Sequence, residues 1–183
     1  DFDALIQKET GKSPDELFAG RHQFLVYDTG ISTKEMTEKY PPMAETSDRN
    51  LSISAIGESD YNRLLAMMGK QPISLSENQY TFSFIEDDRY LDLLNGFLQA
   101  EDPSLQLYGE TYTPAQAQIE KGSSLSIGND MSSAFFALVL PDEQVTGFEP
   151  REVSYNAQYK GDKYEAEEFI IEHLGSENGS FLG

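Results

Sequence analysis

The sequence predicts an α+β domain, in which helices pack on a mixed or mostly antiparallel sheet. Apolar residues alternate at residues 80–84, as in a strand, whereas they follow helical spacing at residues 59–68. These patterns succeed one another without the regular strand–helix–strand rhythm of a parallel sheet. The length of 183 residues and the 38% hydrophobic content suit one folded domain over residues 1–183. A division into two lobes, with a join near residues 100–130, stays open.

The first quarter of the chain predicts a helix start, one strand and a surface segment. An opening apolar segment consists of Phe2, Leu5 and Ile6. A helix start follows at residues 13–16, where a Ser N-cap precedes Pro in the first turn and Glu three residues on. Residues 24–27 predict a short buried strand, ended by Asp28-Thr29-Gly30. The polar stretch that continues to Asp48 is expected to lie on the surface.

The middle of the chain has the clearest signals for where helices begin and end. Residues 51–55 alternate as in a half-buried strand. Ser59 can cap the next helix, and Gly69 can end it. The apolar face of that helix consists of Tyr61, Leu64, Leu65 and Met68. After the strand at residues 80–84, Asp87 or Asp88 can cap a further helix, which Gly96 weakens slightly. The inward residues of that helix are Tyr90, Leu91, Leu94, Phe97 and Leu98.

The last part of the chain predicts four strands and a closing helix. Two short strands, around residues 105–107 and 125–127, are joined by a polar connection. Residues 134–140 are continuously apolar, which predicts a central strand covered on both faces and ended by Pro141-Asp142. Residues 153–159 alternate as the last strand. The closing helix is expected to be capped by Asp162 and Glu165 and to carry Ala166, Phe169, Ile170 and Leu174. The tail from Ser176 is rich in Gly, Ser and Asn and is expected to be loose.

The charge balance narrows the classes of partner. Lys and Arg total 13 and Asp and Glu total 32, which gives a formal net charge of −19. Such a field repels nucleic acid and attracts cations, so we expect no nucleic-acid partner. The charge has two interpretations, solubility alone or an electropositive partner.

Because the chain has no cysteine, disulfides and thiolate metal sites are excluded. The absence of a signal peptide and of a membrane-spanning apolar run favours a fragment of a larger protein.

One short motif resembles a catalytic site. Aspartic proteases carry Asp-Thr-Gly after an apolar strand, as Asp28-Thr29-Gly30 does here, and two such carboxylates share one proton. The sequence contains one copy, so a protease would have to be a symmetric homodimer that uses Asp28. Ile31 follows where that family usually has a small residue. The alternative is a tight turn in which Asp accepts local backbone hydrogen bonds and Gly adopts unusual dihedral angles.

No other pattern indicates catalysis, a cofactor or a metal ion. His22 and His173 have no further His at metal-ligand spacing, and Glu86-Asp87-Asp88 lacks the spacing of a calcium loop. Phosphate-binding and dinucleotide-binding loops and the nucleophile elbow of hydrolases are missing from the sequence. We therefore predict no catalytic, cofactor-binding or metal-binding residues and no enzyme activity in this chain. The ligand-binding residues stay unidentified at this point.

Residues 53–80 resemble a segment of a known family. They read ISAIGESDYNRLLAMMGKQPISLSENQY and are similar to the extracellular domains of FtsX-like ABC transporter permeases. The closest likeness is to the bacitracin-type antimicrobial-peptide detoxification permeases of Firmicutes. The shared parts are Ser59-Asp60-Tyr61-Asn62, Leu64, Gly69, Pro72-Ile73-Ser74-Leu75, Asn78 and Tyr80. Weaker similarities follow at residues 140–143 and 159–163.

The resemblance implies a function that composition alone does not. It implies an extracellular loop of an integral membrane permease, located at the outer face of the cell membrane of a Gram-positive bacterium. A separate cytoplasmic ATPase subunit would use ATP, and a sensor histidine kinase would take its signal from the transporter. The expected function is ligand binding or sensing in antimicrobial-peptide resistance or signalling, with a cationic peptide or a peptide–lipid complex as ligand. The alternative is an extracellular scaffold that binds a histidine kinase or a cell-wall hydrolase and transmits conformation.

Overall fold

The chain forms an α+β fold with a mixed sheet, as the sequence predicts. The computed structural model describes residues 1–46, 50–84, 87–122, 125 and 133–174. It divides the chain into two compact units, here called unit 1 (residues 1–24 and 153–183) and unit 2 (residues 25–152). The division falls at residues 24/25 and 152/153, and the described part of residues 100–130 belongs entirely to unit 2.

Seven strands form the sheet in the order β4-β5-β3-β6-β2-β1-β7. Their bounds are β1 Phe18–Ser32, β2 Ser52–Gly57, β3 Gln79–Phe84, β4 Leu105–Leu107, β5 Glu110–Pro114, β6 Ser133–Leu140 and β7 Glu149–Tyr159. The pairs β1–β2, β3–β6 and β4–β5 are antiparallel, whereas β2–β6 and β3–β5 are parallel. The sheet is therefore mixed, and β1 and β7 each contribute residues to both units.

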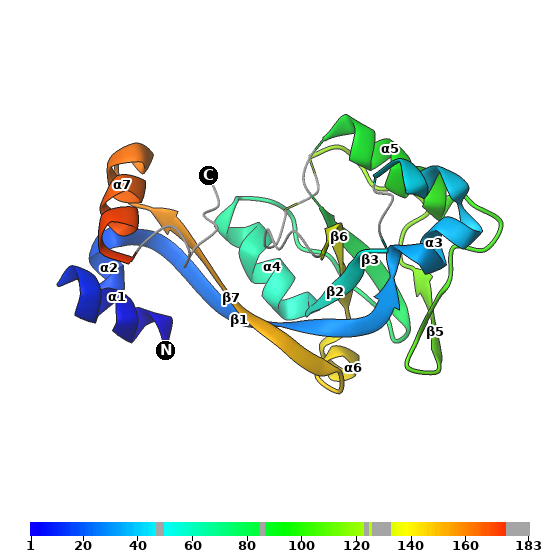
Figure 1. Cartoon of the computed structure of the whole chain (residues 1–183), viewed down its shortest axis with the longest axis horizontal. Coiled ribbons are helices and arrows are strands. Elements are labelled where there is room, and N and C mark those ends of the chain that lie inside the picture. The colour runs from blue at the N-terminus through cyan, green and yellow to red at the C-terminus, as the bar shows by residue number, and fades with distance from the viewer. Residues whose placement is uncertain (47–49, 85–86, 123–124, 126–132, 175–183) are drawn as a thin grey trace. The chain divides into compact units, whose positions relative to one another are not determined.

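The centre of unit 2 is formed by β3, β6 and β2 (Figure 1). The expectation of a central strand at residues 134–140 is confirmed, because β6 lies between β3 and β2 and Leu138 is fully buried. The expectation that residues 51–55 form a half-buried strand is wrong. Residues 53–57 of β2 are all buried, because β1 and β6 flank the strand and α4 (Glu58–Met67) and α6 (Asp142–Val145) pack against it.

Two helices of unit 2 match their predicted positions. Within α4, Tyr61, Leu64 and Leu65 are buried, and the helix ends before Gly69, whose φ is +69°. Met68 is 38% exposed and lies outside the buried face. The next helix, α5 (Asp88–Leu98), begins after Asp87, whose carboxylate accepts the N–H of Arg89 at 2.8 Å. Its buried residues are Leu93, Leu94, Phe97 and Leu98.

The polar stretch after residue 30 is not a simple surface segment. It contains α3 (Thr33–Lys39) and a 3₁₀ helix, η1 (Pro41–Thr46). Ser32 and Glu35 form a capping box at the start of α3. Met36 and Met43 are 0% and 1% exposed and belong to the core of unit 2. These two methionines hold the polar segment to the core of unit 2. Their burial was not predicted from the sequence, because each is isolated among polar residues.

The predicted strand pair around residues 105–127 is half correct. Leu105–Leu107 forms β4, but its partner is β5, which begins three residues later, after a tight turn at Tyr108-Gly109. Leu125 is buried outside any strand, and Ile127 lies outside the described residues.

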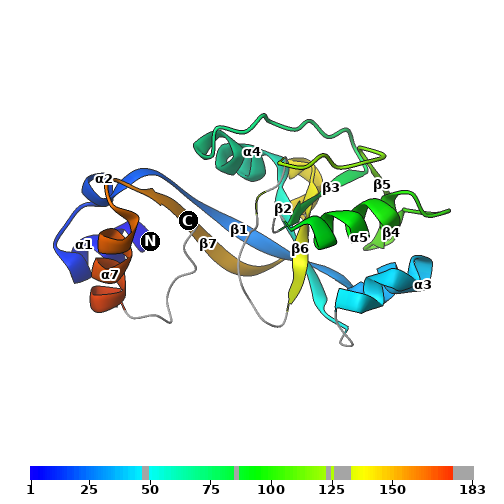
Figure 2. The same cartoon turned by 90° about the horizontal axis from the view of Figure 1, so that it is seen from above.

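Unit 1 contains α1 (Phe2–Thr10), α2 (Pro14–Leu17) and α7 (Lys163–Leu174) together with parts of β1 and β7. Its small core consists of Ile6, Leu17, Phe18 and Ile170. Helices α1 and α7 pack against each other, as Figures 1 and 2 both show. The predicted cap of α7 is confirmed for Asp162, which accepts the N–H groups of Tyr164 (2.8 Å) and Glu165 (3.1 Å). The tail from Ser176 lies outside the described residues.

Candidate functional site

The Asp28-Thr29-Gly30 motif lies inside a strand rather than at its end. β1 continues to Ser32, and the pairing with β2 changes register between Asp28 and Ser32. The carboxylate of Asp28 accepts the N–H of Gly30 at 2.8 Å, and Gly30 has a φ of +73°. The buried hydroxyl of Thr29 donates to the Ile53 carbonyl at 2.6 Å. The motif therefore forms an irregularity in the ladder, and each polar group has a local structural role.

The other ionisable residues considered in the sequence also have structural partners. The His22 ring stacks on Phe24 at 5.5 Å between centroids. Nδ1 of His173 lies 2.8 Å from the Phe169 carbonyl one turn earlier in α7. Asp87 caps α5, and Glu86 lies outside the described residues. Within the described ranges, no group of three or more His, Cys, Asp or Glu side chains could hold a metal ion.

Several residues of the segments that carry the family resemblance are hydrogen-bonded in unit 2. Ser59, expected to cap α4, lies inside the first turn, because the helix begins at Glu58. Both its N–H (3.0 Å) and its hydroxyl donate to the carboxylate of Asp142, which belongs to the second similar segment. Asp142 therefore stabilises the start of α4 from α6, 83 residues away in the sequence.

Two amide side chains fix the segment that follows α4. Asn62 donates to the Ile73 carbonyl (2.9 Å) and accepts the Ile73 N–H (2.8 Å). Asn78 and Gln144 form a second reciprocal pair, with distances of 2.8 and 2.6 Å. These contacts connect α4, residues 68–78, the start of β3 and α6. We call them the α4–α6 framework; its residues are Ser59, Asn62, Ile73, Asn78, Asp142 and Gln144.

Tyr80 extends the similar segment into the core. Its hydroxyl donates to the Pro103 carbonyl at 2.6 Å. Burial, together with the nearby Asp102 carboxylate, raises the pKa of Tyr80 well above its usual range. This phenol is therefore a neutral hydrogen-bond donor, and its role is to hold β3 to the segment before β4.

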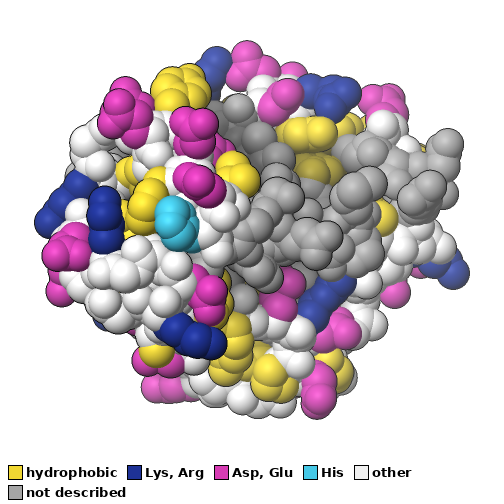
Figure 3. Space-filling model, turned by 60° about the vertical axis from the view of Figure 1, so that its left-hand side comes forward, with side chains coloured by type: hydrophobic (Ala, Val, Ile, Leu, Met, Phe, Trp, Pro, Cys, Tyr) yellow, Lys and Arg dark blue, Asp and Glu magenta, His cyan; other side chains and the backbone are white. Residues whose placement is uncertain are grey.

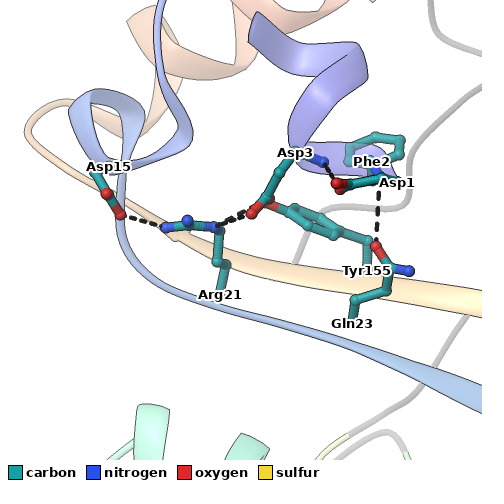
Figure 4. A network of polar contacts seen from close by, with 7 residues as sticks. All are labelled: Asp1, Phe2, Asp3, Asp15, Arg21, Gln23 and Tyr155. Atoms are coloured by element: carbon teal, nitrogen blue, oxygen red, sulfur yellow. Dashed lines mark hydrogen bonds and ion pairs between the residues drawn. The ribbon is translucent and has the colours of Figure 1, made fainter.

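Unit 1 contains a polar hollow of about 270 Å³, lined by Asp3, Arg21, His22, Gln23 and Tyr155. Figure 4 shows the polar contacts that Asp3 and Arg21 make there. Nε of Arg21 lies 3.0 and 3.1 Å from the two oxygens of Asp3, and Nη1 lies 2.6 Å from Asp15. The Tyr155 hydroxyl donates to Asp3 at 2.7 Å. Sequence reasoning missed this cluster, because Tyr155 is 152 residues from Asp3.

The electrostatics of the polar hollow favour a structural role. The Arg21 guanidinium lowers the pKa of Asp15, first through its hydrogen bond and then through its charge. In turn, the hydrogen bond to Asp15 is the main cause that raises the pKa of Arg21. Two carboxylates thus neutralise one guanidinium, and the contacts tie α1, α2, β1 and β7 together. This arrangement contains no nucleophile beside a general base.

A different surface of unit 1 follows one face of α7. We call it the α7 stripe; its residues are Tyr164, Glu167, Glu168, Ile171 and Glu172, which line an open hollow of about 590 Å³. Tyr164 is 78% exposed and Ile171 is 41% exposed. Their spacing of three and four residues places all five on the same side of the helix. Figure 3 shows acidic side chains interspersed with hydrophobic ones on the face that it presents.

The chemistry of the α7 stripe suits a partner that is both cationic and apolar. Among the side chains that the structure describes, which do not include that of Lys163, the three glutamates form no ion pair. A basic group can meet the carboxylates while apolar groups cover Tyr164 and Ile171.

No family model matches the sequence, and no curated protein matches it. Among the helices of the described ranges, none has the length and apolar character needed to cross a membrane.

Proposed function

We propose that this chain is the extracellular ligand-binding or sensing domain of an FtsX-like ABC transporter permease, with a role in antimicrobial-peptide resistance or signalling. The observation that carries the proposal is the α4–α6 framework. Segments that resemble this family at residues 59–78 and 140–143 are distant in the sequence but are hydrogen-bonded in the fold. A chance likeness of separate short segments would not require such contacts. The framework gives Ser59, Asn62 and Asn78 of the similar segment, and Asp142 of the second one, a common structural role.

The charge distribution supports a cationic ligand. A net charge of −19 concentrates cationic peptides near the domain and accelerates their association. The α7 stripe adds exposed apolar groups beside carboxylates. An amphipathic cationic peptide, alone or with its lipid target, carries both complementary features.

The packing of α1 on α7 offers a route for a signal within unit 1. These two helices pack on each other around Ile6 and Ile170, so a change at the α7 stripe would also reach α1. In this proposal the change would pass from unit 1 to the rest of the permease. The cytoplasmic ATPase subunit would then respond, and a sensor histidine kinase would read the same change.

Calorimetric titration with a panel of cationic antimicrobial peptides, with and without their lipid targets, tests the proposal. We expect saturable binding that weakens as salt rises but persists at 0.15 M, where the Debye length is about 8 Å. The triple variant Glu167→Gln/Glu168→Gln/Glu172→Gln should weaken binding more than Glu38→Gln/Glu77→Gln/Glu101→Gln, which removes the same charge from other exposed positions. Equal effects of the two variants, or affinity independent of salt, would contradict this mode of binding.

A scaffold is the second candidate function, favoured by the exposure of Tyr164 and Ile171 on α7. A histidine kinase or a cell-wall hydrolase would then cover these apolar groups. Failure of every peptide to bind, combined with capture of such a purified partner by the wild-type chain but not by Tyr164→Ser/Ile171→Ser, would favour the scaffold.

A further inference from the structure

The turn between β4 and β5 contains a tyrosine whose backbone conformation is unfavourable for a bulky residue. Tyr108 has a φ of +49° and is followed by Gly109 with a φ of +82°. Two-residue hairpin turns with positive φ at both positions favour Asn or Gly, and bulky residues rarely adopt this conformation. Tyr108 is also 58% exposed, so burial does not offset the strain. Residues with backbone strain of this kind cluster at functional sites.

The ring of Tyr108 is held in one place by contacts within unit 2. Its hydroxyl donates to the backbone carbonyl of Asp28 at 2.8 Å. The ring covers Gly30, where an added Cβ would lie 3.3 Å from the nearest ring carbon. Phe148 meets the ring edge to face, with centroids 4.8 Å apart. The irregular part of β1 formed by Asp28-Thr29-Gly30 therefore provides the space in which Tyr108 lies.

Two carboxylates lie close enough to the Tyr108 hydroxyl to affect its pKa. Burial of the hydroxyl raises the pKa of Tyr108, and the carboxylates of Asp28 and Glu149 raise it further. Neither carboxylate forms an ion pair with a lysine or arginine among the described residues. Asp28 uses one oxygen to accept the N–H of Gly30, which leaves its second oxygen available. A cation at the exposed ring would thus meet a π face and two negative groups.

We propose that Tyr108 and Phe148, with Asp28 and Glu149, form a docking site for a lysine or arginine side chain of a polypeptide ligand. The ring face attracts the cation through its quadrupole, and the carboxylates add Coulomb attraction. Because the ring is already fixed, little side-chain entropy is lost on binding. The identity of the polypeptide as an antimicrobial peptide rests on the proposed function, whereas the preference for a cationic side chain rests on these four residues.

Titration of the ¹⁵N-labelled full chain with acetylated, amidated tetralysine, followed by NMR, tests the site. Amide shifts should be largest at residues 28–30, 108–110 and 148–149, and tetraglutamine should produce none of them. Tyr108→Asn is the informative variant, because Asn suits the turn and should keep the fold. It should weaken tetralysine binding about three- to tenfold. Val153→Ala, which shortens an exposed apolar side chain on β7 outside both proposed binding surfaces, should leave these shifts unchanged.

The outcomes separate this site from the proposed function. Shifts spread over the acidic surface, or equal binding by wild type and Tyr108→Asn, would overturn the site. Antimicrobial peptides that bind Tyr108→Asn as tightly as wild type would also overturn it, but would leave the proposed function intact. Localised tetralysine binding without binding of any antimicrobial peptide would support the site and contradict the proposed function.

Discussion

At the scale of single residues, close contacts decide what a side chain does, and Gly96 illustrates this. The sequence predicts only that Gly96 weakens α5. In the structure an added Cβ would overlap the hydroxyl and ring of Tyr40. Ala would favour the helix by about 1 kcal/mol, but overpacking costs about 1–3 kcal/mol. The difference is about 0–2 kcal/mol, so we expect Gly96→Ala to lower the free energy of unfolding by roughly 1 kcal/mol in urea denaturation.

Gly147→Ala is the matched control for that measurement. The nearest atom to its added Cβ is the Gln144 carbonyl oxygen at 3.4 Å. Its effect should stay within about 0.5 kcal/mol. A stabilising effect of Gly96→Ala would show that the Tyr40 ring moves aside at little cost.

Asp102 provides a residue-scale prediction about pH. Hydrogen bonds from Ser104 and the nearby Lys39 ammonium lower the pKa of Asp102 to about 2. Because the pKa in the folded state lies below the unfolded value of 3.8, the carboxylate stabilises the fold above pH 3.8. That contribution is lost as the pH falls toward 2. Asp102→Asn should therefore be less stable than wild type at pH 7, and the difference should shrink between pH 4 and pH 2.

Chemical denaturation at pH 7, 4 and 2 measures this difference. Glu38→Gln is the control, because its partner Lys34 lies 3.9 Å away on the surface of α3. Exposed pairs of this kind contribute about 0–1 kcal/mol. A gap between wild type and Asp102→Asn that stays constant with pH would contradict the assigned cause.

Residue-level roles were predictable from the sequence only where the partner is local. Asp87 and Asp162 cap the helices that directly follow them, as predicted. The partners of Asp3 and Tyr108 come from distant segments, and no local pattern identifies them. Of the two interpretations of the Asp-Thr-Gly motif, the turn correctly describes the local hydrogen bond of Asp28 and the positive φ of Gly30. Its expected position at the end of a strand is wrong, because the pairing of β1 with β2 continues to Ser32.

At the scale of elements, α4 shows how a distant residue can stabilise a helix start. The predicted cap, Ser59, is itself bonded to the Asp142 carboxylate. Removal of a capping carboxylate costs about 0.5–2 kcal/mol. We expect Asp142→Ala to destabilise the chain by this amount in thermal or chemical denaturation, whereas its exposed neighbour Glu143→Ala should have little effect. The effects of Asp142→Ala and Ser59→Ala should not be additive, because the two residues form one contact. Additive effects would place the cap elsewhere.

Elements with regular patterns were predictable, and those held by isolated contacts were not. The continuous apolar run of β6 and the alternation of β3 predict their strands correctly. Helix α3 was missed, because only Thr33 and Met36 are buried among its polar residues. Likewise, β4 and β5 are joined at Tyr108-Gly109, and Tyr is not a residue that predicts such a turn.

At the scale of the whole chain, composition identified the charge but not the division into units. Unit 1 combines the first and last parts of the chain, so no linker or change of composition marks its boundary. The candidate binding surfaces were equally hard to predict from the sequence. In the sequence, the α7 stripe looks like an ordinary solvent-exposed helix face. It becomes a candidate binding surface because two apolar side chains among its glutamates are exposed in the structure.

The excess of acidic residues leads to a prediction about salt. With 32 acidic and 13 basic side chains, repulsion between carboxylates opposes the folded state. Salt screens both repulsion and attraction, but several ion pairs are exposed and each contributes little. Relief of repulsion should therefore dominate. Raising NaCl from 10 to 150 mM (about 30 to 8 Å in Debye length) should raise Tm by a few degrees, equivalent to about 1 kcal/mol. KCl at equal ionic strength should act identically, because screening depends on ionic strength. A fall in Tm would mean that attractive ion pairs outweigh the net charge.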